Sequence, residues 1–199
     1  MTRAFHFAFV VALLATGGCD IRTFDVPKEL AYVEANRDTF TDLEDHPLAS
    51  IPIGAVSGDL ADLEGCWGRA TNFGAEGNNY AAGSNNYKVY RFDMAESSLT
   101  VQLLARRPFG LDAFVEHVYS AEVTSDNEMT VQFLTSWSDT TFSDFGDEPR
   151  EHEDSEPFRI EVTLYNDAFK FGESTDPPGG PTGLPLRQNE VFLRFDCPE

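Results

Sequence analysis

Basic residues are scarce in this sequence. Its 199 residues include 14 lysines and arginines against 34 aspartates and glutamates, which gives a formal net charge of −20. A surface this acidic repels nucleic acid and anionic lipid head groups, so we expect no nucleic-acid partner. The charge fits a role in solubility or adaptation to salt, and attraction of a cationic partner is the alternative.

The short motifs of common enzymes are also absent. The sequence has no Gly-x-Ser-x-Gly elbow, no His-Glu-x-x-His, no phosphate loop and no Cys-x-x-Cys pair. The histidines after the N-terminal segment, His46, His117 and His152, are too scattered to predict a metal site. We therefore expect no catalytic residues, no metal and no cofactor. A hydrolase or metalloprotein stays open as an alternative, and it would need His117 hydrogen-bonded to a carboxylate in a cleft.

Long apolar segments are missing after residue 19, so we expect no membrane-spanning helix there. Residues 1–19 differ from the rest. Arg3 precedes a short apolar run, residues 4–15, and three small residues, 16–18, lead to Cys19. A charged start, an apolar middle too short to span a bilayer and small residues before a cleavage site are typical of a secretory signal peptide.

The ending at Cys19 resembles the lipobox of bacterial lipoprotein signal peptides. The resemblance implies that Cys19 is acylated, with palmitate among its chains, and becomes the mature N-terminus. Each buried methylene contributes about 0.8 kcal/mol, and stable anchoring takes more than one chain. We expect an exported protein anchored in the cell envelope, on the periplasmic side of the inner or outer membrane or at the cell surface. Cleavage near Gly18, which releases a soluble protein, is the alternative.

The segment after the signal peptide lacks strand alternation. Pro27 followed by residues 28–34 predicts a short helix, because proline suits the start of a helix. Prolines and a glycine between residues 46 and 54 interrupt any longer pattern. We divide the chain into a signal peptide (1–19), a partly helical or disordered tether (20–60) and a β domain (61–199).

Alternating apolar and polar residues begin at Cys66. In the segment 158–165, for example, Phe158, Ile160 and Val162 alternate with polar residues. Such alternation predicts strands with one buried and one solvated face, as in antiparallel sheets. The pattern predicts eight strands, at 66–71, 86–92, 98–105, 115–124, 128–135, 158–165, 168–173 and 190–196.

The connections between these strands alternate in length, since the first, third, fifth and seventh are longer than those between them. In an up-and-down meander the tight turns then lie at one end and the long loops at the other. Closure of the meander into a barrel removes its edges and brings Cys66, at the start of the first strand, to Cys197, after the last. If Cys19 carries lipid, these two cysteines remain as a pair for a disulfide. A two-sheet sandwich, which separates them or places them on facing sheets, is the competing fold.

Residues 63–67, Leu-Glu-Gly-Cys-Trp, are similar to the Gly-x-Trp motif of the calycin superfamily, which includes the lipocalins. The resemblance covers residues 63–197 and implies an eight-stranded antiparallel up-and-down barrel. It also implies that a basic residue of the last strand, here Arg194, packs across Trp67, which is a favourable cation–π arrangement.

The lipocalin resemblance implies a small, largely apolar ligand inside the barrel, or a structural use of the same scaffold. His117 shares a face with Tyr119 and is expected to point inward. With Tyr87 and Arg91 it would form a polar spot in an apolar pocket, and Phe133 would line the same pocket. The alternative is a filled barrel in which His117 is an ordinary core histidine with one hydrogen-bond partner.

The long loops suggest partners of another kind. The Gly- and Asn-rich loop 72–85 and the segment 177–181 are expected to form a lid or to contact an envelope protein or glycan, with tolerated surface insertions as the alternative. The acidic residues of 144–156 allow a weak calcium site, but their spacing matches no calcium loop. A solvated acidic loop is the alternative.

Overall fold

Each of the eight predicted strands forms. The computed structural model describes residues 25–52, 58–73, 84–106, 112–140, 143–144, 149–152, 154–174 and 190–199. The eight strands are β1 (Gly65–Phe73), β2 (Ser84–Asp93), β3 (Ser98–Arg106), β4 (Ala113–Ser125), β5 (Glu128–Thr140), β8 (Phe158–Tyr165), β9 (Ala168–Ser174) and β10 (Val191–Phe195). Two further short strands that the sequence does not predict, β6 (Ser143–Asp144) and β7 (Arg150–Glu151), pair with β5.

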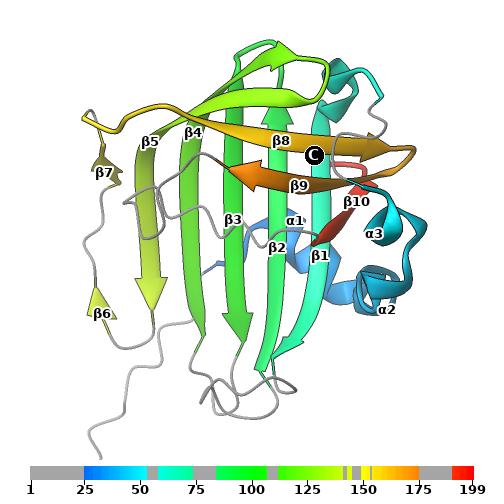
Figure 1. Cartoon of the computed structure of the whole chain (residues 1–199). Helices are drawn as coiled ribbons and strands as arrows, with labels where there is room; N and C mark the ends of the chain where they lie inside the picture. The colour runs from blue at the N-terminus through cyan, green and yellow to red at the C-terminus, as the bar shows by residue number, and fades with distance from the viewer. Residues whose placement is uncertain are drawn as a thin grey trace, which may run out of the picture.

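The eight strands close into an antiparallel up-and-down barrel, as predicted. Each pairs with its neighbours among them along the chain, and β10 pairs with β1 to complete the ring. In Figure 1, β8 and β9 run across β1–β4 at the end of the barrel where the tight turns lie. The other ends of β1–β4 extend beyond β8 and β9. The competing sandwich is thereby excluded.

A disulfide between Cys66 and Cys197 fastens the two ends of the barrel chain, which confirms the predicted pairing. The Cα atoms of the two cysteines are 5.3 Å apart, and 131 positions separate them in the sequence. The partners follow from the register at the closing seam, where Cys66 lies opposite Phe195, two residues before Cys197.

Short helices precede the barrel, in the segment expected to be a partly helical tether. The helix predicted after Pro27 is α1 (Lys28–Ala35), and α2 (Arg37–Phe40), η1 (Leu43–Asp45), α3 (Pro47–Ser50) and η2 (Leu60–Leu63) follow it. The described part of this segment, from residue 25, does not extend freely from the barrel. Its apolar side chains, including Leu30, Val33 and Phe40, are buried against the barrel wall.

The barrel wall is therefore apolar on both faces over β1 and β2. An inner cluster fills the tight-turn end and includes Trp67, Tyr90 and Phe169. An outer cluster places Tyr87 and Val89 of β2 against α1. Helix α1 lies on the outer face of β1–β3, as Figure 1 shows, and covers apolar side chains that water would otherwise contact.

Helix α3 covers another part of the outer wall, over β9 and β10. Leu48 of α3 packs with Ala168 and Val191 there. Lys170 lies beneath it, almost fully buried, and its Nζ donates to the main-chain oxygens of Ile51 and Ala49. Burial lowers the pKa of Lys170, because the charged form loses hydration that two carbonyl groups replace only in part.

Several sequence predictions lie outside the described residues. They are the signal peptide with Cys19, the segment 177–181 and most of the loop 72–85. In the part of the chain that is described, no helix combines the length and the apolar character needed to cross a bilayer.

Candidate functional site

Three of the five predicted ligand-site residues meet on the inner face of the barrel. His117 and Tyr119 come from β4, and Phe133 comes from β5. The ring of Phe133 lies 5.1 Å from the His117 ring and 5.1 Å from the Tyr119 ring, between centroids. The Tyr119 hydroxyl and His117 Nδ1 are 3.2 Å apart and share a hydrogen bond. The inward direction predicted for His117 is thus observed.

The other two predicted residues, Tyr87 and Arg91, do not join this cluster. Tyr87 belongs to the outer apolar cluster beneath the N-terminal helices. Arg91 lies on the same outer face, where its guanidinium is 3.6 Å from Glu29 of α1. The expectation that they complete a pocket with His117 is wrong. Strand β2 is apolar on both faces, so its sequence does not reveal which face points inward.

Two residues that sequence reasoning did not select complete the inner cluster. His152 stacks on Phe133 with 4.0 Å between ring centroids, and Ser136 Oγ lies 2.9 Å from His152 Nε2. A bulge in the β4–β5 pairing lets both Phe133 and Ser136 face inward, although an odd number of positions separates them. His152 follows β7, whose two residues show no alternation. The sequence therefore holds no signal for either contact.

The Ser136–His152 distance is that of a nucleophile and its base. Such a pair needs a third group to orient the histidine, and no carboxylate in the described ranges accepts a hydrogen bond from His152. The described residues also contain no group of three or more His, Cys, Asp or Glu side chains placed to hold a metal ion. The pair therefore fixes the strand β7 segment against β5, and it does not build a complete triad within these ranges.

The inner face changes character along the barrel axis. At the tight-turn end, inward side chains such as Trp67, Leu99 and Val101 are fully buried. Toward the long loops, many inward residues of β1–β5 are only partly buried, namely Thr71, Asn86, Leu103, Ala105, Ala113, Val115, His117, Ser136 and Ser138. Most of these side chains are small or polar, and the described side chains are more exposed in this half of the inner face than in the other.

Charged residues also point inward in this half. Arg69 of β1 lies opposite Lys88 of β2, and both side chains are buried. Lys88 Nζ forms an ion pair with Glu190 at 2.5 Å, and Arg69 Nη1 donates to the main-chain oxygen of Val191 at 3.1 Å. Both contacts lie at the start of β10. Sequence reasoning did not select Arg69 or Lys88 as site residues.

Tyr90 lies next to these charges, one inward position closer to the tight turns. Its ring is fully buried and packs on Phe192 at 4.6 Å and on Phe171 at 5.2 Å. Burial, helped by the nearby Glu190 carboxylate, raises the pKa of Tyr90 well above its ordinary value. The Tyr90 hydroxyl therefore keeps its proton and remains a hydrogen-bond donor at any physiological pH.

The tight-turn end is closed by the pair named from the family motif. The guanidinium carbon of Arg194 lies 4.7 Å from the centroid of the Trp67 ring. Arg194 also donates to the main-chain oxygens of Asp62 and Glu64, and Trp67 Nε1 donates to that of Leu63 at 2.7 Å. These contacts hold η2 across the end of the barrel.

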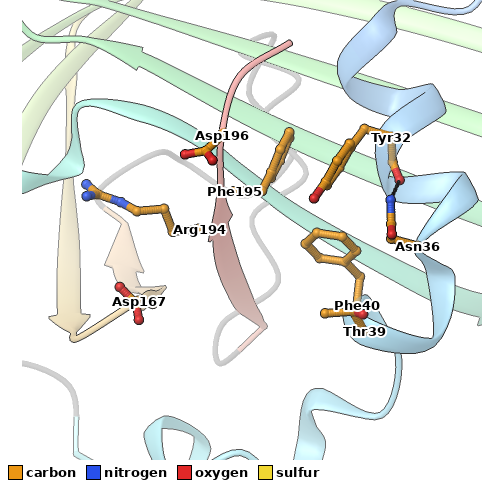
Figure 2. A pocket seen from close by; sticks show the side chains of 8 residues that line it. All are labelled: Tyr32, Asn36, Thr39, Phe40, Asp167, Arg194, Phe195 and Asp196. Atoms are coloured by element: carbon orange, nitrogen blue, oxygen red, sulfur yellow. Dashed lines mark hydrogen bonds between the residues drawn. The ribbon is translucent and has the colours of Figure 1, made fainter.

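A groove of about 330 Å³ lies on the outside, at the same end. Tyr32 of α1 stacks on Phe195 of β10 at 5.1 Å, and Phe40 of α2 meets both rings edge-on. Figure 2 shows these rings on one side and the side chains of Arg194, Asp167 and Asp196 on the other. The lining residues are Tyr32, Asn36, Thr39, Phe40, Asp167, Arg194, Phe195 and Asp196.

No protein-family model, no curated protein and no solved structure matches this chain.

Proposed function

We propose that this protein is a lipid-anchored, lipocalin-like binding module of the cell envelope whose barrel holds a small, largely apolar molecule. The closed eight-stranded barrel and the contact of Arg194 with Trp67 support the lipocalin-like identity. An eight-stranded barrel is wide enough to hold one small ligand.

The contrast between the two halves of the inner face is the observation that carries this proposal. Leu103 and Val115 are apolar, point inward and are still partly exposed, whereas inward side chains at the other end are fully buried. Partly exposed apolar side chains beside a few polar groups are the usual lining of a ligand site. A small apolar molecule would remove Leu103 and Val115 from water at about 25 cal/mol per Å² of area.

The proposed anchor fits this arrangement. Lys28, at the start of α1, donates to the main-chain oxygen of Glu199, and Cys197 is bonded to Cys66 at the start of β1. The chain thus enters the described domain near the tight-turn end of the barrel. An anchor at Cys19 would hold that end toward the membrane and leave the long-loop end facing away from it.

Native mass spectrometry of the mature domain tests the proposal. A protein of residues 20–199, preceded by a serine in place of Cys19, would be incubated with a lipid extract and desalted. Its mass would then be measured. We expect a retained small molecule that Val115→Trp removes, because an inward indole fills the partly exposed half of the inner face. Val118→Trp adds the same bulk to the outer face of β4 and should leave binding unchanged. A bare mass for the folded wild-type domain would contradict the proposal.

A second candidate is an envelope interaction protein that uses its outer surface for a protein or glycan. The observation in its favour is the groove of Figure 2, where Tyr32 is 42% exposed on one side and the carboxylates of Asp167 and Asp196 line the other. Exposed tyrosine is typical of interaction surfaces. If this candidate is right, Tyr32→Ala abolishes binding of the protein or glycan partner. If the barrel holds a small apolar molecule instead, Tyr32→Ala leaves the mass of the retained molecule unchanged.

A further inference from the structure

Three buried hydrogen-bond donors on the inner face of β1 and β2 have no hydrogen-bond partner in the described part of the chain. They are Arg69 Nε, Tyr90 Oη and Asn86 Nδ2. Arg69 lies opposite Lys88, which is the inward residue between Asn86 and Tyr90 on β2. Buried polar groups in folded proteins are nearly always hydrogen-bonded, because an unsatisfied one costs about 1–3 kcal/mol. Three such groups on adjacent strands therefore indicate a missing partner.

The missing partner must accept hydrogen bonds. Arg69 Nε and Asn86 Nδ2 can only donate, and the Tyr90 hydroxyl keeps its proton because burial raises its pKa. A water molecule would satisfy one or two of these groups, but it brings two protons of its own. A group that only accepts, such as a carboxylate or a phosphate, is the complement of each of these donors.

Charge leads to the same conclusion. Among the described residues, the inward charges at this level are Arg69, Lys88 and Glu190, and Glu190 is ion-paired with Lys88. Arg69 is only 9% exposed, and no described carboxylate lies within salt-bridge distance of it. A buried guanidinium without a counter-charge is costly. The chain as a whole carries −20, so this inner positive charge is unlike its surroundings.

We propose that Arg69 and Tyr90, with Asn86 beside them, bind the anionic head group of a single-chain amphiphile, while Leu103 and Val115 contact its apolar chain. Leu103 is the cross-strand neighbour of Lys88, and Val115 is the next neighbour on β4, so an apolar chain meets them directly beside the donors. This inference rests on the proposed function and adds the chemical class of the ligand.

Calorimetry with ten-carbon probes tests it, using the full chain with Cys19→Ser so that no lipid is attached. Decanoate and decyl phosphate carry the anionic head, decanol is the neutral match, and decyltrimethylammonium has the opposite charge. We expect an anionic probe to bind about tenfold or more tightly than decanol, which is the effect of a hydrogen bond to a charged group. The tighter of the two anions identifies the head group.

Variants connect the preference to the named residues. Arg69→Met should remove the preference for the anion and leave decanol binding unchanged. Tyr90→Phe keeps the ring contacts and should weaken only the affinity for the anionic probe, by about threefold to tenfold. Tyr90→Phe decides the question if Arg69→Met does not fold. Arg159→Met, on the exposed outer face of β8, is the matched control and should change neither affinity.

The outcomes separate this inference from the proposed function. Equal binding of decanoate, decyl phosphate and decanol, unaffected by Tyr90→Phe, would overturn the inference of an anionic head group. The proposal of an apolar ligand in the barrel would stand. Tighter binding of decyltrimethylammonium would overturn the anionic head group in the same way. No binding of any probe by the folded protein would overturn both.

Discussion

Gly68 of β1 lies directly beneath Val33 of α1. A Cβ atom at Gly68 would be 2.6 Å from Val33 Cγ2 and 3.1 Å from Cε1 of Phe195, so only glycine allows the helix to approach the barrel wall this closely. The N-terminal helices are therefore fitted to the outer face of β1, and the barrel wall and its cover form one packed unit.

Gly68→Ala should destabilise the protein by about 1–3 kcal/mol, because the added methyl group overpacks this contact. Val33→Ala in the same chain should recover part of that loss by making room. The free energy of unfolding of the wild type, both single variants and the double variant, from chemical denaturation, measures the coupling. Additive effects of the two substitutions would show that α1 does not pack on Gly68.

The Cys66–Cys197 disulfide closes a long segment of chain. With 131 positions between the cysteines, the chain-entropy model gives a stabilisation of about 5 kcal/mol. Replacement of both cysteines by alanine should lower the free energy of unfolding by an amount of this order, and reduction of the wild type should reproduce it. A loss below about 1 kcal/mol would mean that the disulfide does not restrict the unfolded chain.

Arg194 should matter more to stability than its exposure suggests. Arg194→Ala removes the cation–π contact with Trp67, at about 1 kcal/mol, and donors to two main-chain oxygens, at about 1 kcal/mol each. We expect a loss of about 1–3 kcal/mol and a red shift of Trp67 fluorescence as η2 loosens. Arg159→Ala, another exposed strand arginine, should cost less than about 0.5 kcal/mol. Equal losses for the two variants would contradict the closing role of Arg194.

Tyr90 should make the fold sensitive to alkaline pH. Its pKa is raised in the folded protein, so above pH 10.0 the unfolded chain releases a proton that the folded protein retains. The contribution of Tyr90 to stability is therefore fully present below pH 10.0 and is lost as the pH rises toward the folded pKa. The difference in tyrosinate absorbance between wild type and Tyr90→Phe should show no transition near pH 10.0 while the fold persists. A transition there would place Tyr90 in water.

Much of the fold could be predicted from the sequence because alternation is a local signal. Each strand has an apolar face of its own. The alternating loop lengths predict that the first strand starts and the last strand finishes at the same end of the barrel, so Cys66 and Cys197 are expected to meet. The cover of the outer wall could not be predicted, since Tyr87 and Val89 are as apolar as the inward Tyr90 and Phe92. Without knowledge of α1, strand β2 gives no sign of which face is inside.

The candidate site was predicted less well than the fold. His117, Tyr119 and Phe133 were found because they follow the alternation of β4 and β5. Ser136 was missed because a bulge shifts the register beyond Phe133, and His152 because it reaches the inner face from a long connection. Arg69 and Lys88 were missed because charged residues are ordinarily expected to face water, and only closure of the barrel turns them inward.

Amide chemical shifts measured during a titration with decanoate test most directly whether the inner face is the ligand site. We predict that the full chain with Cys19→Ser shows saturable shifts at Arg69, Tyr90, Leu103 and Val115, while Tyr32 and Phe40 in the outer groove stay unchanged. Saturable shifts at Tyr32 and Phe40 with an unchanged inner face would contradict the proposal and place the ligand outside the barrel.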